Sequence, residues 1–160
     1  RLPTEAEQEY ILRAGGTAKG KYHFGNDESK LEKYAWFNKN SGDTTHPVGD
    51  RLPLIIDGRR FHDVIGNVWE WSWDEWSNKL PEGKNPVHAS SSSSGVFRVV
   101  RGGSSLFNAQ ILHSAFRYGA TPGSWSDRAR TIPWWSAKNS RHWFDYASVG
   151  FRLVRTVPNP

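Results

Sequence analysis

The chain has 160 residues, a formal net charge of +5, nine tryptophans and no cysteine. This length suits one domain with its own core, and the lack of cysteine excludes disulfides, thiol nucleophiles and thiolate metal sites. Lysine and arginine are scattered and no nucleic-acid-binding motif occurs, so we expect a solvated basic surface and no nucleic-acid partner. No run of about 20 apolar residues occurs, so we expect no membrane insertion.

The first third of the chain predicts one clear helix followed by loops. A capping box at residues 4–7 predicts a helix that ends near Arg13, before a pair of glycines. Residues 17–60 are polar and rich in glycine, which predicts loops with a short helix near residues 31–34. Because Arg1 lies inside what reads as a motif, we expect an N-terminal part to precede it.

The rest of the chain predicts strands that enclose a long loop. Residues 68–73 alternate large aromatic with smaller side chains, as a strand with one buried face would. Residues 77–95 predict an exposed connection that ends in a serine run. Residues 99–104 and 149–154 combine β-branched residues with glycines and predict strands or strand entries. The segment between these two frames has neither helical nor strand period, which predicts a structured loop that carries function.

Five motifs occur in a fixed order along the chain. They are Arg-Leu-Pro-Thr-Glu-Ala-Glu (1–7), Thr-His-Pro-Val-Gly (45–49), Gly-Asn-Val-Trp-Glu-Trp (66–71), Arg-Val-Val-Arg-Gly-Gly-Ser (98–104) and Gly-Phe-Arg-Leu-Val (150–154). Together they resemble the signatures of the formylglycine-generating-enzyme (sulfatase-modifying factor) family. The resemblance implies an α+β, C-type-lectin-like fold, rich in loops, with a small twisted antiparallel sheet. It also implies one domain over residues 1–160, with the family's first half missing or shortened.

The resemblance brings in two enzyme chemistries, and the residues argue against both. Oxidising members of the family bind copper through two cysteines shortly after the Gly-Gly-Ser, but residues 105–113 contain none. The ergothioneine-pathway oxygenases hold iron mostly with histidines from a separate helical domain, and the six histidines here are dispersed. We therefore expect no catalytic residues and no required cofactor, and we keep a metal-dependent oxidase or oxygenase with altered chemistry as the alternative.

The chain is most similar to the variable proteins of diversity-generating retroelements. In those proteins a reverse transcriptase rewrites codons between an Arg-Gly-Gly-Ser frame and a Gly-Phe-Arg frame, which implies a candidate variable region at residues 98–154. Tryptophan and lysine cannot arise by adenine-only mutation of an asparagine codon, so residues 128–144, which contain several, are interpreted as an insertion or fixed scaffold. The positions that match fixed scaffold positions are Ala109, Gln110, Ser114, Ala115 and Arg117.

The apolar residues of the loop could form core or an exposed binding patch. Since they follow no period, the resemblance favours the patch, and we expect several of Leu106, Phe107, Ile111, Leu112 and Phe116 to be exposed. The partner would be a protein or glycan ligand on a target surface. We expect this chain to be displayed on a virion or cell surface, and the sequence leaves its oligomeric state open. The predicted ligand-binding residues are Ser105, Leu106, Phe107, Asn108, Ile111, Leu112, His113, Phe116, Tyr118, Gly119, Ala120, Ser124, Ser126 and Asp127.

A calcium site is implied by the resemblance at Asp63, Gly66, Val68 and Glu70. The family site uses two side-chain oxygens and backbone carbonyls, and hard oxygen ligands suit calcium. The alternative is a tight turn in which Glu70 and Asn67 accept hydrogen bonds from backbone amides. Both readings stay open from the sequence.

The remaining motifs read as structural. The tryptophans of residues 69–76 could form a sugar-binding platform, which would make the chain a carbohydrate-binding scaffold module, but core packing is favoured for most of them. Arg101 is predicted to tie loops to carboxylates such as Asp74. Glu5 and Glu7 are two apart on a helix and point in different directions, so they form no acid–base pair.

Overall fold

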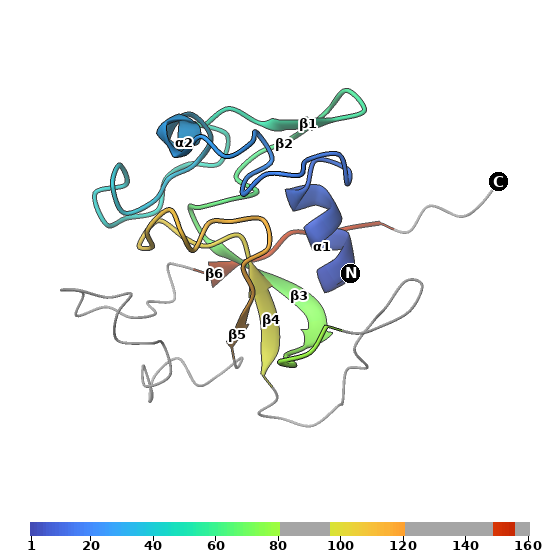
Figure 1. Cartoon of the computed structure of the whole chain (residues 1–160). Helices are drawn as coiled ribbons and strands as arrows, with labels where there is room; N and C mark the ends of the chain where they lie inside the picture. Colours follow the sequence, from blue (N-terminus) through green and yellow to red (C-terminus); the bar gives the residue numbers. More distant parts are fainter. Residues whose placement is uncertain (81–96, 121–148, 156–160) are drawn as a thin grey trace.

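The computed structural model describes residues 1–80, 97–120 and 149–155, and shows a mixed α+β arrangement with much irregular chain (Figure 1). None of the helices in these three ranges is long and apolar enough to cross a membrane. In chain order the elements are α1 (Glu5–Leu12), the 3-10 helix η1 (Glu28–Lys30), α2 (Leu31–Tyr34), β1 (Leu54–Ile56), β2 (Arg59–Phe61), β3 (Trp69–Glu75), β4 (Arg98–Arg101), β5 (Tyr118–Ala120) and β6 (Val149–Gly150).

A four-stranded sheet in the order β5-β4-β3-β6 organises the structure. β4 pairs antiparallel with both β3 and β5, whereas β6 pairs parallel with β3, so the sheet is mixed rather than wholly antiparallel. The register places Glu70 opposite Arg101, and it shifts between Trp71 and Glu75. The two glycine-containing frames predicted from the sequence therefore lie on the two sides of β3.

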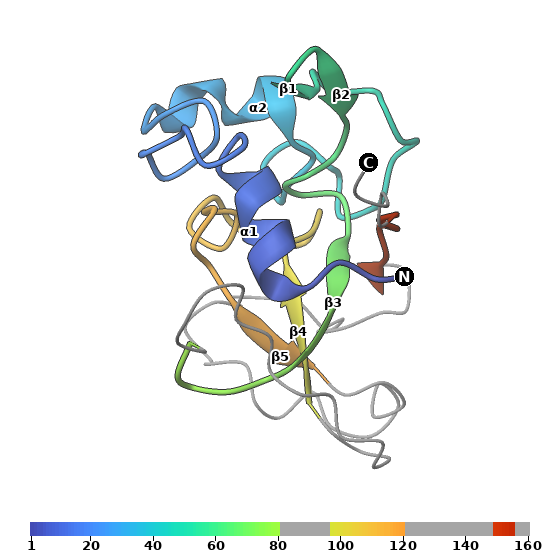
Figure 2. The ribbon, with the colours of Figure 1, turned by 90° about the vertical axis from the view of Figure 1, so that its right-hand side faces the viewer.

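Helix α1 covers one face of this sheet (Figure 2). Its capping box is formed as predicted: the Glu7 N–H donates to Thr4 Oγ1 at 3.2 Å, and the Thr4 N–H donates to Glu7 Oε2 at 2.8 Å. The side chains of β3 that face α1 are polar and buried, namely Glu70, Ser72 and Asp74. Burial of such groups is tolerated because α1 supplies partners, including Gln8, which bonds both Glu70 and Ser72.

The alternation predicted for residues 68–73 is present, but the fully buried face is the polar one. On the opposite face only Trp69 is in the core, at 1% exposure; Trp71 is half-buried and Trp73 is 46% exposed. Trp69 contacts the rings of Phe107, Phe116 and Tyr118, at centroid distances of 5.4, 6.1 and 6.0 Å. The expectation that most of these tryptophans are core therefore holds fully for Trp69 alone.

A two-stranded hairpin, β1 and β2, lies beside α2 at the end opposite the four-stranded sheet (Figure 1). Its turn is Asp57-Gly58, with φ of 49° and 74°. The prediction of loops throughout residues 17–60 is wrong here, although α2 lies where a short helix was expected. An Asp-Gly pair between two apolar-containing runs is a strong hairpin signal, and it was sufficient to predict this one.

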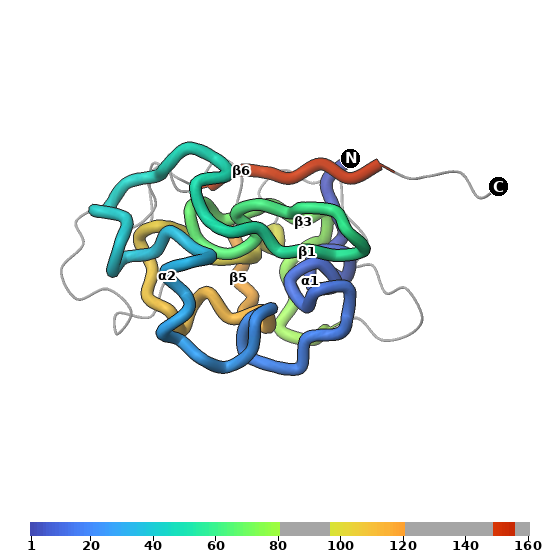
Figure 3. The backbone as a smooth tube through the Cα atoms, turned by 90° about the horizontal axis from the view of Figure 1, so that it is seen from above, coloured from blue at the N-terminus to red at the C-terminus, as the bar shows by residue number. Residues whose placement is uncertain are grey.

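The two ends of the described chain lie side by side (Figure 3). The N–H of Val154 donates to the carbonyl of Arg1 at 3.0 Å, and the N–H of Trp73 donates to the carbonyl of Pro3 at 2.8 Å. The first residues thus lie between β3 and the C-terminal segment 151–155. Main-chain hydrogen bonds thus tie the start of the chain both to β3 and to the C-terminal segment.

Candidate ligand-binding surface

Residues 102–117, which join β4 to β5, form an irregular loop between the four-stranded sheet and residues 20–50 (Figure 1). Other parts of the chain hold this loop by its backbone, and each bond involves a main-chain group of the loop. These bonds are Ser105 N–H to Asn67 O (2.9 Å), Asn38 N–H to Phe107 O (3.1 Å), Ser114 N–H to Lys21 O (2.8 Å), Tyr22 Oη–H to Ala109 O (3.0 Å) and Ser41 Oγ–H to Ser105 O (2.8 Å).

Two glycines at the start of the loop allow it to pass close to the core. Gly102 and Gly103 have φ of 90° and 75°, and a Cβ at Gly103 would lie 2.8 Å from Leu112 Cδ1. A side chain at either position would therefore add backbone strain, and at Gly103 also a clash. These two glycines therefore have a structural role, because they let the backbone pass close to its neighbours.

The expectation that several of the loop's five apolar residues are exposed is wrong, because Leu106, Phe107 and Phe116 are half-buried and the other two are buried. Ile111 is 5% exposed and Leu112 is fully buried, and both belong to the core cluster around Trp69. Burial follows from the tertiary contact of Leu112 with Gly103, which lies on the neighbouring part of the loop. Two further predicted binding residues, Ser105 and Ala120, are buried as well.

Three aromatic residues of the predicted site are half-buried. Phe107, Phe116 and Tyr118 pack against the core around Trp69 and are neither enclosed nor free. A ligand could meet only the part of each ring that remains exposed. They contribute rigid apolar surface rather than mobile side chains.

The outward surface of the loop consists of Gln110 and Ala115, which are exposed, with Leu106, Asn108 and His113 half-buried. The ring of His113 lies edge-on to Tyr22 at 5.2 Å. Burial lowers the pKa of His113, and the charge of Lys21 lowers it further, so the imidazole is neutral at pH 7 and offers one donor and one acceptor. We call these five residues the outer loop surface.

Other members of the predicted set lie elsewhere. Gly119 is half-buried under Trp76, since a Cβ there would lie 2.5 Å from Trp76 Cγ. Ser124, Ser126 and Asp127 fall outside the described residues. The structure therefore places the predicted binding residues from 105 to 120 in one part of the fold, but some of them are in the core and others at the surface.

The predicted scaffold positions divide in the same way. Ala109 is buried, Ser114 Oγ donates to the Leu12 carbonyl at 2.9 Å, and Arg117 forms a two-point ion pair with Glu5. These contacts explain why such positions would be fixed. Gln110 and Ala115 are exposed, and no contact of their side chains in the described structure explains a fixed identity.

Arg101 and α1 form a buried ion network beside the loop. Arg101 Nη2 lies 2.7 Å from Glu9 Oε2, and Arg101 Nη1 lies 3.8 Å from Glu5 Oε1. The predicted partner, Asp74, instead accepts a hydrogen bond from the Glu5 N–H at 2.7 Å. Burial lowers the pKa of Arg101, and the charges of Glu9 and Glu5 oppose that shift.

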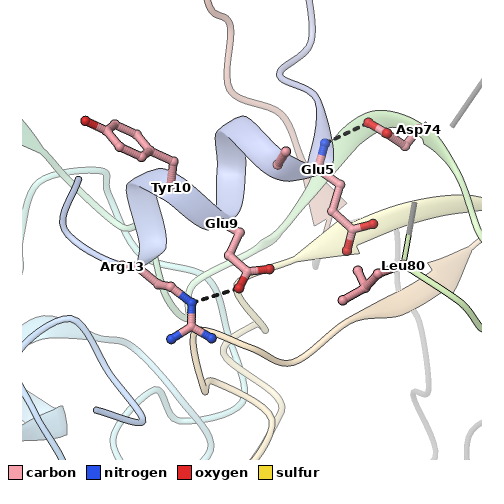
Figure 4. A pocket seen from close by; sticks show the side chains of 7 residues that line it. Glu5, Glu9, Tyr10, Arg13, Asp74 and Leu80 are labelled. Atoms are coloured by element: carbon pink, nitrogen blue, oxygen red, sulfur yellow. Dashed lines mark hydrogen bonds and ion pairs between the residues drawn. The ribbon is translucent and has the colours of Figure 1, made fainter. Parts of the chain in front are cut away.

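A cavity of about 300 Å³ lies between α1 and residues Asp74 and Leu80; seven residues line it, six of them labelled in Figure 4. Its charged side chains are engaged with one another or with the network above: Arg13 Nε donates to Glu9 Oε1 at 2.7 Å. Glu7 points away to Arg1, whose guanidinium lowers the pKa of Glu7 to about 2. The structure thus agrees that Glu5 and Glu7 form no acid–base pair.

Some of the oxygen atoms in the implied calcium site are available to bind a cation. Asp63 is buried, and while its Oδ2 accepts from the Gly49 N–H at 2.9 Å, its Oδ1 has no hydrogen-bond partner. Glu70 is paired with Arg152 at 2.6 and 3.0 Å, but its Oε1 accepts only one of these bonds. Burial raises the pKa of Glu70, and the charge of Arg152 opposes that shift. A buried carboxylate oxygen without a partner is a suitable calcium ligand.

The alternative interpretation, a tight turn, is present at Asn67 but not at Glu70, whose carboxylate accepts hydrogen bonds from the side chains of Gln8 and Arg152. Asn67 has φ of 58° and is buried; its side chain accepts from the His46 N–H and donates to the His46 carbonyl, both at 3.0 Å. Its main chain joins Trp36 to Ser105. Asn67 therefore links His46, Trp36 and the start of the loop at Ser105.

Comparison with known proteins identifies the family. Residues 1–157 match the family described as sulfatase-modifying factor enzyme 1-like domain. The chain belongs to this family. Among curated members of the sulfatase-modifying factor family, the formylglycine-generating enzyme of Mus musculus is 38% identical over 131 residues, covering 74% of this chain and 32% of that protein. The enzyme of Thermomonospora curvata is 32% identical over 120 residues, covering 66% of this chain and 38% of that protein.

Solved structures of sulfatase-modifying factor relatives confirm the α+β, C-type-lectin-like fold. Treponema denticola variable protein 1 has a TM-score of 0.58 and 33% identity, covering 77% of this chain and 42% of that chain. PvdO from Pseudomonas aeruginosa has a TM-score of 0.58 and 30% identity, and the match covers 77% of this chain and 47% of PvdO. The resemblance to variable proteins is thereby confirmed. This chain spans about a third of the length of the curated relatives and under half of the solved ones.

Proposed function

We propose that this chain is a non-enzymatic ligand-binding protein, and that the outer loop surface is its binding site. The observation that supports this most directly is the way the loop is held. Main-chain groups at Ser105, Phe107, Ala109 and Ser114 are fixed by other parts of the chain, while the side chains of the outer loop surface are exposed or half-buried. A rigid backbone with outward side chains limits the entropy lost when a partner binds.

The chemistry of the segment after Gly-Gly-Ser supports a non-enzymatic role. Residues 105–113 contain no cysteine. Without a thiolate at these positions, the copper-dependent oxidation that the resemblance implies has neither its ligand nor its thiol-exchange step. The second candidate function, a metal-dependent oxidase or oxygenase with altered chemistry, is favoured by the names of the curated relatives.

We further propose that a retroelement diversifies this surface and that the protein is displayed on a virion or cell surface. The similarity to a variable protein supports this. Burial and the scaffold positions together set which residues could vary: Ile111 and Leu112 are core residues and would stay apolar, whereas Leu106, Asn108 and His113 are half-buried, match no scaffold position and could be exchanged. The partner would be a protein or glycan on a target surface, with half-buried aromatic rings providing apolar area beside adaptable polar groups.

Sequencing this locus from many individuals of the source population tests the proposal. We expect variation concentrated at Leu106, Asn108 and His113, with Gly103 and Leu112 unchanged. Invariance throughout residues 105–120 would overturn diversification. Copper or iron bound at one equivalent by the purified protein, together with oxidation of a thiol substrate, would overturn the non-enzymatic role and establish the second candidate.

Calcium is proposed as a structural ion rather than a catalytic one. Asp63 and Glu70 would supply side-chain oxygens, and the resemblance adds the carbonyls of Gly66 and Val68. Such an ion would fix the segment that leads into β3 and would leave the outer loop surface free for the ligand.

A further inference from the structure

We infer that Arg101 is a positioning residue for the outer loop surface, acting through the main chain of residues 114–116. This inference rests on the proposed function, because it concerns the same surface. Arg101 is the last residue of β4 and its side chain is fully buried. Nothing that binds the outer loop surface would touch it directly.

The guanidinium of Arg101 binds two carbonyl groups of the loop and one carboxylate of α1. Nη1 donates to the Phe116 carbonyl at 2.7 Å, and Nη2 donates to the Ser114 carbonyl at 3.2 Å. Nη2 also donates to Glu9 Oε2 at 2.7 Å, across 92 positions of the sequence. One planar group thus fixes the distance between α1 and the end of the loop.

The contacts of Arg101 do not depend on the side chains that the loop presents. Both loop acceptors are carbonyl oxygens, which every residue type has. The neighbouring Arg117 behaves differently, because its own side chain reaches Glu5, at 2.7 Å from Nη2 to Oε2, and the Ser77 carbonyl at 3.0 Å. Arg101 is thus a residue of β4 that binds the loop's main chain, whereas Arg117 is a residue of the loop's C-terminal end and anchors it through its own side chain.

The counter-charges come from one face of α1. Glu5 and Glu9 are four residues apart, so they lie on the same side of the helix and receive the two arginines together. A fully buried guanidinium requires such compensation, since desolvation of an unpaired charge costs several kcal/mol. The first motif of the chain thus takes part in shaping a surface about a hundred residues later in sequence.

Residue-resolved amide hydrogen exchange of Arg101→Lys tests the inference without a ligand. We expect the protection of the Ser114 and Phe116 amides to fall at least tenfold, while the amides of Trp71 and Val100 in the sheet change less than threefold. The matched control is Arg98→Lys on the same strand, because Arg98 donates to the Trp73 carbonyl of β3 and lies over the Trp73 ring. This control should leave the Ser114 and Phe116 amides unchanged relative to the sheet.

A second variant covers the case in which Arg101→Lys does not fold. The Glu9 side chain is 30% exposed, so a substitution there should be tolerated. Glu9→Gln keeps an oxygen acceptor for Arg101 and removes only the negative charge. It should lower the protection of Ser114 and Phe116 about threefold relative to the sheet. The positioning role would be overturned if the Ser114 and Phe116 amides were as well protected in both variants as in the wild type. It would also be overturned if the protection of the sheet amides fell as much as that of the loop amides. Failure of the binding proposal would appear in the population sequences and would leave these exchange ratios unaffected.

Discussion

Arg152 and Glu70 form a two-point ion pair, with Nη2 to Oε1 at 2.6 Å and Nε to Oε2 at 3.0 Å, which joins the Gly-Phe-Arg motif to β3. The Glu70 side chain is 8% exposed and the Arg152 side chain 23% exposed. Arg152 also donates to the carbonyl of His62 at 2.8 Å. One side chain therefore connects the C-terminal segment, β3 and the segment that leads into it.

Removing Arg152 should destabilise the fold strongly, because Glu70 would remain as a buried charge. We expect Arg152→Ala to lower the free energy of unfolding by about 3 kcal/mol, measured by urea denaturation. The double variant with Glu70→Gln should recover part of this loss, since the buried group is then neutral. A loss below about 1 kcal/mol, or no recovery in the double variant, would contradict a coupled buried pair.

The loop should separate into core and surface when its residues are substituted. Leu112→Ala removes a fully buried side chain beside Gly103, and we expect a loss of about 3 kcal/mol in the free energy of unfolding. Gln110→Ala, two positions earlier and exposed, should change it by less than about 0.5 kcal/mol. Equal effects of the two substitutions would show that the division into core and outer loop surface is wrong.

Local signals in the sequence predicted the local structure well. The capping box placed the start of α1, because its two hydrogen bonds join residues only three positions apart. The β1–β2 hairpin carries an equally local signal, because the Asp57-Gly58 turn joins its two strands, although loops were predicted for this segment. Motifs with a physical meaning within a few residues could therefore be interpreted without the fold.

Burial in the candidate site could not be predicted, because contacts between distant residues decide it. Leu112 is core since it packs on Gly103 and near Trp69, and no period in the loop reveals this. Arg101 finds Glu9 across 92 positions, whereas Asp74 was the expected partner. The motif order predicted the fold, but contacts between distant residues decide which side chains of the candidate site are buried.

Gly66 should be less replaceable than Gly58, although both have φ of 74°. A Cβ at Gly66 would lie 2.3 Å from the Trp36 carbonyl oxygen, whereas a Cβ at Gly58 meets nothing within 4 Å. We expect Gly58→Ala to cost about 1 kcal/mol from backbone strain alone, and Gly66→Ala to cost about 3 kcal/mol or more. Thermal unfolding of the two variants measures the difference, and similar melting temperatures would contradict the close approach.

His23 should make the fold sensitive to acid. Both of its ring nitrogens are buried without a hydrogen-bond partner, edge-on to the rings of Phe24 and Tyr34 at 4.9 and 5.0 Å. Burial lowers the pKa of His23 from 6.5 to about 4. The folded state therefore binds fewer protons than the unfolded state in this range, so the contribution to stability is complete above pH 6.5 and is lost as pH falls toward 4.

The size of this effect should be about 3 kcal/mol between pH 7 and pH 4, and His23→Phe should remove it. Urea denaturation at both pH values measures it in the wild type and the variant. His113→Phe serves as the control, because that ring is partly open to solvent and should change the pH dependence less. The same loss of stability at low pH in wild type and His23→Phe would contradict a buried neutral imidazole.

Calcium should stabilise the fold through Asp63. Its Oδ1 is buried without a partner, and the negative charge of Asp63 adds to the rise in the pKa of Glu70, so a cation would relieve both costs. Because an ion that binds only the folded state stabilises it by mass action, millimolar calcium should raise the melting temperature of the wild type by several degrees. Asp63→Asn should abolish most of this rise, whereas Asp57→Asn in the exposed β1–β2 turn should retain it. An unchanged melting temperature in the wild type, or an equal rise in Asp63→Asn, would exclude calcium at this site.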